Sequence, residues 1–154
     1  MKKQCVFVCM LLTLIVLSAC RKQDYPRQEP LPLTKKELLT QKKWKLVNFG
    51  FDNNNNGAVD ADEDVAPDCV KDNIHSFFAD GTGTVEENVL FCNNLPPISH
   101  FQWAFRNNDT QIDFFTSVAD LQTLSAETMI LSYPINGSPG ASGSDRLLVT
   151  YKHP

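Results

Sequence analysis

Hydrophobic residues follow two different patterns along this chain. Residues 6–17 form an almost unbroken apolar run behind Met1-Lys2-Lys3, whereas beyond Trp44 apolar and polar residues alternate. The run has roughly a dozen residues, fewer than the ~20 that a helix needs to cross a hydrocarbon core of ~30 Å. A positive start, a short apolar run and small residues after it are the layout of a secretory signal peptide. Alternation with period two predicts strands that bury one face.

The alternating part of the chain predicts about eight short strands. Val47, Phe49 and Phe51 share one strand face, and Phe101, Trp103 and Phe105 share another. The other strands are expected at 74–78, 83–89, 111–115, 119–124, 129–133 and 146–152. The aromatic set is predicted to form the core, with a cavity lining as the alternative reading; it comprises Trp44, Phe49, Phe51, Phe77, Phe101, Trp103, Phe105, Phe114 and Tyr133.

Short polar connections between these strands predict an antiparallel meander. Asp80-Gly81 is a hairpin signal, and residues 107–109 and 125–127 are polar links. Closing about eight such strands into a small barrel removes exposed edges and leaves an interior filled by side chains or able to hold one small ligand. A sandwich of two sheets is the competing architecture. Ahead of the first strand, Thr34 and Glu37 fit a capping box, which predicts a short helix from about Lys35 to Thr40.

The end of the apolar run carries a second signal. Leu17-Ser18-Ala19-Cys20 resembles the lipobox of bacterial lipoproteins. The resemblance implies diacylglycerol on the Cys20 sulfur, cleavage before Cys20 and anchoring of the protein to a membrane. The alternative is an ordinary secretory signal with a chance cysteine. The expected organisation is a signal peptide at 1–19, a lipidated Pro-containing tether at 20–33 and one β-domain at 34–154. At ~3.1 Å per residue the tether spans up to about 40 Å.

Removal of the predicted signal peptide changes the length and the charge of the mature chain. About 135 residues remain, enough for one domain with a core. The two signal lysines are lost, so the mature chain is more acidic than the precursor, whose formal charge is −4. No basic stripe remains to bind nucleic acid.

The cysteine count predicts a disulfide. Cys5 and Cys9 leave with the signal and Cys20 is lipidated, which leaves Cys69 and Cys92 in an oxidising compartment. Closing a loop of about two dozen residues contributes roughly 3 kcal/mol in the chain-entropy model. Two free buried thiols are the alternative. A zinc site is less favoured, because neither cysteine has a CxxC partner or a histidine at ligand spacing.

The order of several short motifs resembles the lipocalin-like domains of Bacteroidetes lipoproteins. In sequence these are Leu38-Leu39 with Lys43-Trp44-Lys45-Leu46, then Asp68-Cys69 with Lys71-Asp72, Phe77-Phe78-Ala79-Asp80-Gly81-Thr82-Gly83, Cys92, Gln102-Trp103-Ala104-Phe105, and Leu121, Leu124 and Met129-Ile130-Leu131. Here Asn73 stands where that family has a second acidic residue, and the first loop is longer. The resemblance implies a small calyx-like barrel with the two cysteines paired, and no assigned enzymatic activity.

The first loop carries the most specific chemistry. Residues 52–63 match the EF-hand pattern D-x-[DN]-x-[DN]-G-x5-E at every specified position. Calcium prefers six to eight oxygen ligands, and Gly57 permits the sharp turn that directs them to one centre. The predicted ligands are Asp52, Asn54, Asn56, the carbonyl of Ala58, Asp60 and Glu63. We expect a calcium ion of structural role; the alternative is a solvated turn rich in Asn and Asp.

No motif in the sequence predicts catalysis. His75, His100 and His153 form no HExxH or similar pattern, and residues 140–144 are not a GxSxG elbow. Glu86 and Glu87 are adjacent on a strand, so their side chains face opposite sides. We therefore expect a protein that is not an enzyme and has no catalytic residues.

The combined expectation is a lipid-anchored protein of the bacterial cell envelope that binds a small apolar or amphipathic ligand in its barrel mouth, with the loop at 136–144 as a possible gate. The alternative is a structural or protein-interaction module. Arg21-Lys22-Gln23-Asp24 lacks the paired acidic residues of surface-export signals. The expected location is therefore the periplasmic side of a membrane, with the outer membrane favoured.

Overall fold

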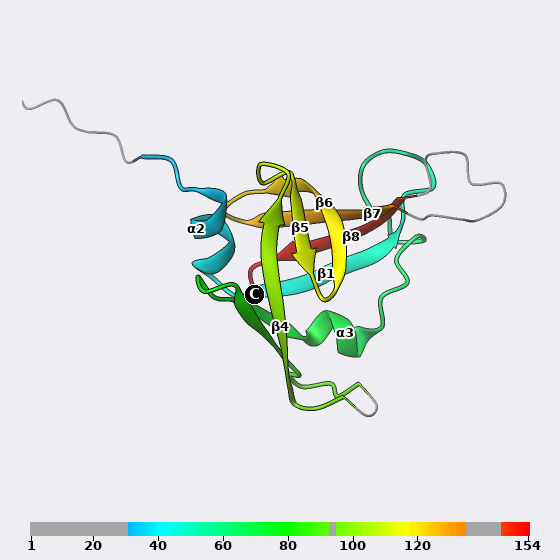
Figure 1. Cartoon of the computed structure of the whole chain (residues 1–154). Coiled ribbons are helices and arrows are strands. Elements are labelled where there is room, and N and C mark those ends of the chain that lie inside the picture. The colour runs from blue at the N-terminus through cyan, green and yellow to red at the C-terminus, as the bar shows by residue number, and fades with distance from the viewer. Residues whose placement is uncertain (1–30, 93–94, 135–145) are drawn as a thin grey trace, which may run out of the picture. The chain divides into compact units, whose positions relative to one another are not determined.

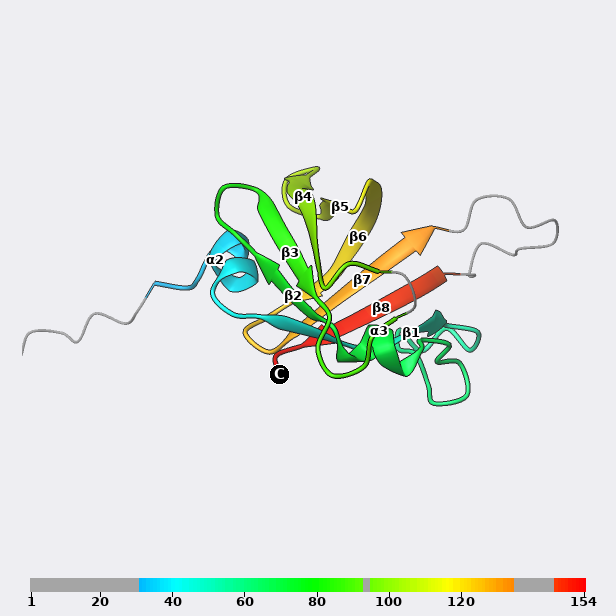
Figure 2. The same ribbon diagram turned by 90° about the horizontal axis from the view of Figure 1, so that it is seen from below.

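Eight antiparallel strands, in chain order, close into a barrel in which β8 pairs with β1 (Figures 1 and 2). The computed structural model describes residues 31–92, 95–134 and 146–154. The elements are α2 (Lys35–Thr40), β1 (Trp44–Phe51), α3 (Asp68–Asp72), β2 (Ile74–Phe77), β3 (Thr82–Glu86), β4 (Ile98–Arg106), β5 (Gln111–Phe114), β6 (Ser117–Leu124), β7 (Thr128–Pro134) and β8 (Arg146–Lys152). The predicted all-β meander with a helix before its first strand is confirmed.

All these elements belong to one unit of the chain. The chain divides between Pro32 and Leu33. The predicted signal peptide and nearly all of the predicted tether lie outside the described residues. None of the described helices is long and apolar enough to span a membrane.

Helix α2 forms as its sequence predicts and covers one end of the barrel. The Thr34 hydroxyl accepts a hydrogen bond from the Glu37 backbone N–H (3.2 Å), and the Glu37 carboxylate accepts one from the Thr34 N–H (2.8 Å). Leu39 is fully buried, and its carbonyl accepts a hydrogen bond from the indole of Trp44. Because α2 contacts β2 and β6, which lie in different parts of the ring, it crosses that end of the barrel.

A bulge in β1 changes which residues face inward. Trp44 and Leu46 are buried, and the pairing with β8 then shifts between Leu46 and Asn48. The extra residue moves the following side chains to the opposite parity. Val47, the extra residue, is consequently exposed, so the prediction that it shares a buried face with Phe49 is wrong. Phe51, the last residue of β1, has the same parity as Phe49 but is also exposed.

The join between β1 and β2 is short. These strands pair only at Trp44↔His75 and Lys45↔Ile74, whereas β1 and β8 pair at six positions. The segment before α3 runs along the rest of this edge of β1. Asp64 forms a bridge with Gly50 and accepts a hydrogen bond from the Phe49 N–H, and the Val65 N–H donates to the Phe49 carbonyl. The long first loop therefore completes the wall of the barrel.

Aromatic rings fill the interior next to β2, β4 and β5. Phe77 lies 5.2 Å from Phe101, 5.9 Å from Trp103 and 5.3 Å from Phe114, measured between ring centroids. Most of these contacts are edge-to-face or tilted, the geometries that aromatic pairs prefer. Of the predicted core set, Phe51 alone is exposed, and Phe49, Phe105 and Tyr133 are partly buried.

We expect Gly50 to be required for the contact between β1 and the first loop. A Cβ atom at Gly50 would lie 2.0 Å from the carbonyl oxygen of Glu63. Gly50→Ala should lower the free energy of unfolding by about 2–3 kcal/mol through overpacking, measured by urea denaturation. Gly57→Ala is the matched control: a Cβ there meets nothing within 4 Å, so only the positive φ of +82° is strained, at about 1 kcal/mol. Equal losses in the two variants would contradict the contact.

Candidate functional site

A cavity of about 470 Å³ opens at the end of the barrel away from α2. Its walls come from β1, the segment before α3, α3 itself, the turn between β5 and β6, and the strands β7 and β8. None of the described residues in this lining is charged, and their polar side chains are Ser117, Tyr133 and Tyr151. The cavity has the size and the apolar walls of small-molecule sites in proteins.

Tyr133 and Tyr151 supply the polar groups of this cavity. Burial raises the pKa of Tyr133 to about 12. Burial also raises the pKa of Tyr151, and the nearby Tyr133 adds to the effect. The two phenols are therefore neutral at physiological pH. They are suited to a hydrogen bond with an uncharged polar group, whereas a charged group would enter without an opposite charge among the described lining residues.

The turn between β5 and β6 is strained where it borders the cavity. Phe115 has φ +50° and Thr116 has φ +67°. A two-residue turn with positive φ at both positions favours Asn and Gly, and it is unusual for an aromatic or β-branched residue. Phe115 packs between Phe101 and Phe114, at centroid distances of 4.7 and 4.6 Å. These ring contacts hold the turn in its strained form.

A larger hollow of about 1180 Å³ lies at the turn between β2 and β3 and beside β4 and β5. It borders the point at which β4 changes partner: β4 pairs with β3 up to Gln102 and with β5 from Trp103 onward. Its walls include exposed polar residues such as Asp80, His100 and Gln102. We regard the barrel mouth as the better candidate for a small apolar ligand, because its walls are more apolar and lie among core residues.

The first loop is curled by hydrogen bonds from its own side chains. The Asp52 carboxylate accepts hydrogen bonds from the Asn56 and Gly57 N–H groups, each at 2.9 Å. Glu63 accepts from the Asn53 N–H at 2.8 Å and the Asp60 N–H at 3.0 Å. Asp52 and Glu63 are buried, at 8 % exposure each. The two ends of the predicted calcium loop are therefore fixed.

The middle of this loop directs amide groups at one carboxylate. The side-chain Nδ2 atoms of Asn54 and Asn56 both donate to Asp60 Oδ2, at 2.8 and 3.1 Å. Rotating either amide by 180° places its oxygen where the nitrogen now lies. In the structure the amide oxygens of Asn54 and Asn56 instead accept hydrogen bonds from the Asn56 and Ala58 N–H groups, at 3.0 and 2.8 Å. Binding a cation between these side chains would require both amides to turn away from these N–H groups.

Other predicted ligands of the metal site are exposed to solvent. Ala58 and the two asparagines are exposed, whereas Val59 is buried, as expected for the apolar position of the loop. Among the residues that the structure describes, no three or more histidine, cysteine, aspartate or glutamate side chains lie together at metal-binding spacing. The predicted ligand set depends on amide and carbonyl oxygens as well as carboxylates.

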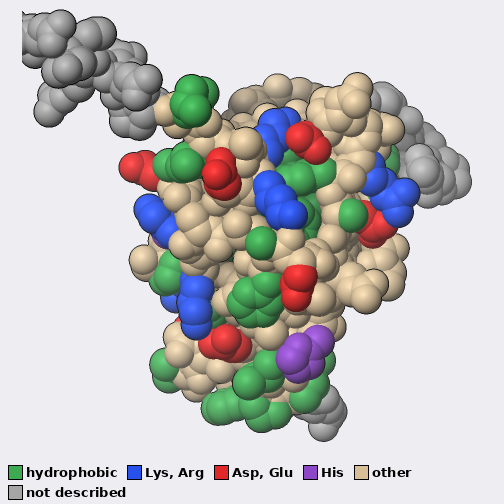
Figure 3. Space-filling view, turned by 60° about the vertical axis from the view of Figure 1, so that its left-hand side comes forward, with side chains coloured by type: hydrophobic (Ala, Val, Ile, Leu, Met, Phe, Trp, Pro, Cys, Tyr) green, Lys and Arg blue, Asp and Glu red, His purple; other side chains and the backbone are tan. Residues whose placement is uncertain are grey.

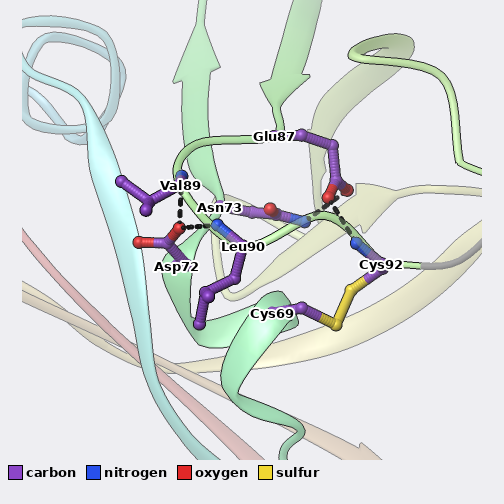
Figure 4. Close-up of a disulfide and its surroundings, with 7 residues drawn as sticks. All are labelled: Cys69, Asp72, Asn73, Glu87, Val89, Leu90 and Cys92. Atoms are coloured by element: carbon purple, nitrogen blue, oxygen red, sulfur yellow. Dashed lines mark hydrogen bonds between the residues drawn. A yellow bond between two sulfur atoms is a disulfide. The ribbon is translucent and has the colours of Figure 1, made fainter.

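The predicted disulfide is present and joins α3 to the loop between β3 and β4 (Figure 4). Cys69 and Cys92 are bonded, with their Cα atoms 5.3 Å apart. Asn73 donates to the Glu87 carboxylate at 3.0 Å, and Glu87 also accepts from the Cys92 N–H. An acidic residue at position 73 would instead meet Glu87 with like charge, which gives a local reason for the asparagine at this position.

The same loop contains a feature that the sequence analysis missed. Strand β3 ends at Glu86 instead of continuing to residue 89, and Val89, Leu90 and Phe91 are exposed. Asp72 accepts hydrogen bonds from the backbone N–H groups of Val89 and Leu90. The signal in the sequence is three consecutive apolar residues without alternation, which does not fit a strand with one solvated face.

The residues considered for catalysis lie in separate environments. His75 is buried in the barrel beside Tyr151, His100 is exposed, and His153 stacks on Trp44 with ring centroids 4.1 Å apart. Glu86 pairs with Lys43, whereas Glu87 faces Asn73 and Cys92. The two glutamates therefore do not address one substrate.

Comparison with models of known protein families finds no match, and no curated protein is significantly similar to the chain. The closed ring of antiparallel strands is compatible with a lipocalin-like domain.

We expect His75 to make folding sensitive to mild acid. Burial lowers its pKa from 6.5 to about 4, opposed in part by a hydrogen bond with the Asn73 backbone. The unfolded chain therefore binds a proton near pH 6.5 and the folded chain near pH 4. Stability should be complete above pH 6.5 and fall by about 3 kcal/mol as the pH is lowered to about 4.

The measurement is urea denaturation between pH 8 and pH 4, with His75→Leu as the comparison. The variant should lose the slope in this range whatever its absolute stability. The carboxylates with lowered pKa values, Glu37, Asp64, Asp72 and Asp80, begin to lose their contribution below about pH 5. They do so equally in the wild type and the variant, so the difference between the two proteins isolates His75. An unchanged slope in the variant would assign the acid sensitivity to another group.

Proposed function

We propose that this chain is a lipid-anchored protein of the bacterial cell envelope whose lipocalin-like domain binds a small apolar or amphipathic ligand in the mouth of its barrel. The observation that carries the proposal is the cavity of about 470 Å³. A barrel with side chains filling its interior to both ends would leave no such cavity. Here the aromatic cluster fills the middle of the barrel, α2 covers one end, and among the described residues the other end is left uncovered.

The chemistry of the walls favours an uncharged ligand. Leu46, Phe49, Val70 and Leu147 offer apolar surface, and Tyr133 offers a neutral hydroxyl. Burying an unpaired charge among such groups costs far more than burying a hydrogen-bonded hydroxyl or carbonyl. The predicted gate at 136–144 lies outside the described residues.

A calcium ion bound to the first loop is part of the proposal, in a structural role. The residues that would hold it are Asp52, Asn54, Asn56, the Ala58 carbonyl, Asp60 and Glu63. The convergence of two amides on Asp60 and the burial of Asp52 and Glu63 support this site. Because the segment after this loop completes the barrel wall beside β1, an ion there would stabilise the mouth.

The lipid anchor and the location are proposed from the sequence. The lipobox-like Leu17-Ser18-Ala19-Cys20 supports attachment through Cys20. Residues 21–24, without paired acids, support the periplasmic side, with the outer membrane favoured. Catalysis is not part of the proposed function.

A protein-interaction module of the envelope is the second candidate. Exposed apolar side chains in the loop between β3 and β4 favour it, because surfaces of this kind mark interaction sites. The two candidate functions differ in their use of the cavity: the first requires a ligand to bind in it, and the second does not.

We expect the chain from Arg21 onward to bind N-phenyl-1-naphthylamine, an uncharged fluorescent probe, at one saturable site. The related sulfonate 8-anilino-1-naphthalenesulfonate should bind at least about tenfold more weakly, a difference of 1.4 kcal/mol, because the described walls offer no cation. Ala66→Trp places an indole in the mouth and should weaken probe binding by a similar factor.

Ala104→Trp is the matched control, since Ala104 is exposed and lines the outer hollow. Fluorescence titration checks all three proteins. Equal binding by the wild type and Ala66→Trp would remove the barrel mouth as the ligand site and favour the protein-interaction module.

We expect calcium to stabilise the domain and Glu63→Gln to abolish this effect. At a calcium concentration 100 times the dissociation constant, the gain is about 2.7 kcal/mol. Extracellular calcium modules bind with dissociation constants of about 10⁻⁴–10⁻³ M, so 10 mM calcium is sufficient for a clear shift. The measurement is the difference in melting temperature between calcium and chelator, together with titration calorimetry.

Asp62→Asn is the control, because it removes the same charge from an exposed neighbour of Glu63. The comparison uses the calcium-dependent difference, since Glu63 also holds two backbone N–H groups without an ion. Absence of heat and of stabilisation in the wild type would leave the loop as a hydrogen-bonded turn.

A further inference from the structure

The apolar ridge formed by Val89, Leu90 and Phe91 is turned toward solvent. Their exposed fractions are 75, 48 and 66 %. Leu95, later in the same loop, is also exposed. Figure 3 shows hydrophobic side chains gathered at the lower end of the molecule, where Figure 1 places the loop between β3 and β4. Large apolar side chains in consecutive positions are seldom left in water without a partner.

Hydrogen bonds and a disulfide hold the backbone on both sides of the ridge. The Asp72 carboxylate accepts hydrogen bonds from the Val89 N–H at 2.6 Å and the Leu90 N–H at 2.8 Å. The disulfide ties the next part of the loop to α3, as Figure 4 shows. A surface fixed before binding loses little conformational entropy when it meets its partner.

The ridge itself carries no charge, and the two carboxylates beside it, Asp72 and Glu87, accept hydrogen bonds from backbone N–H groups of the same loop. From Asn88 to Phe105 the sequence contains no Asp, Glu, Lys or Arg. Two lysines are paired with acidic residues near α3, Lys45 with Asp72 and Lys71 with Asp64. A charge-free apolar surface can enter the boundary between lipid headgroups and acyl chains without desolvating an ion, and it needs no acidic lipid.

The backbone of the ridge also suits a lipid partner. A protein that added a strand here would need free N–H groups, whereas those of Val89 and Leu90 already donate to Asp72. In a lipid environment, backbone polar groups must be satisfied within the protein. Two of the three ridge amides meet this condition before any contact is made.

We propose that the apolar ridge docks on the surface of a lipid bilayer, with Phe91 as its main inserted side chain. Helix α3 lies between the ridge and the cavity: Val70 lines the cavity, and Asp72 holds the ridge. Docking therefore places the barrel mouth beside the lipid surface. The proposal draws on the proposed lipid anchor only for proximity to a membrane.

The proposed tether allows this contact. Residues 20–33 span up to about 40 Å when extended. A compact domain of about 120 residues has a radius of gyration of about 14 Å. The tether is thus long enough for the domain to turn any of its sides toward the bilayer, and the ridge decides which side is favoured.

The test reads the depth of a tryptophan placed on the ridge. The chain from Arg21 onward, with an N-terminal hexahistidine tag, is held on phosphatidylcholine vesicles that contain nickel-chelating lipid. This attachment does not depend on lipidation of Cys20, so failure of the anchor, read separately by mass spectrometry of Cys20, is distinguishable from failure of docking. Phe91→Trp is compared with Phe78→Trp, which is 46 % exposed in the turn at the other end of β3.

Trp44 and Trp103 are buried and fluoresce in every variant. Their emission is removed by subtracting the spectrum of the wild type. Brominated phospholipid should quench the emission of Phe91→Trp at least twofold more than that of Phe78→Trp, with a blue shift on vesicle attachment. Equal quenching of the two variants overturns the proposal. Shielding of Phe91→Trp from aqueous acrylamide without quenching by bromolipid also overturns it, and assigns the ridge to a protein contact.

Discussion

The pairing of β8 with β1 closes the sheet, and the cavity, the first loop and α2 take their positions from it. Six residue pairs join these strands, including Phe49↔Val149 and Leu46↔Tyr151. These two pairs contribute to the interior and to the cavity wall. Closure also removes most of the unpaired edge that a meander would otherwise present. The last strand of the chain is therefore needed to define a site whose other walls are formed much earlier in the sequence.

Local sequence signals were sufficient wherever one interaction determined the structure. The capping box of Thr34 and Glu37 predicted the start of α2 correctly. The disulfide was predicted by counting the cysteines that remain after the expected signal cleavage and lipidation, and Cys69 and Cys92 are bonded. Strands were located by alternation, but their ends were less certain. Strand β3 stops at Glu86 because Asp72 and Glu87 bind the backbone of the following loop, an interaction between distant residues that periodicity does not reveal.

The error at Val47 in β1 has a different origin. Alternation assumes that every residue pairs with one partner, and the bulge between Leu46 and Asn48 breaks this assumption. A bulge depends on the partner strand, so one strand read alone could not show it. The candidate site was also only partly predictable from the sequence. The loop motif named six possible calcium ligands. The cavity could not be predicted, because its volume depends on how much of the space inside the ring the side chains fill. The strained turn at Phe115 and Thr116 also depends on ring contacts with Phe101 and Phe114.

The short join between β1 and β2 has a consequence for motion. Elsewhere the ring is held by ladders of four to seven residue pairs, but here two pairs and the hydrogen bonds around Asp64 carry the connection. Local opening starts where the fewest backbone hydrogen bonds must break together. The join around Lys45 and Ile74 is therefore the place where the ring opens with the fewest broken backbone hydrogen bonds. Thermal motion therefore opens the barrel at this one join and does not expand the whole ring evenly.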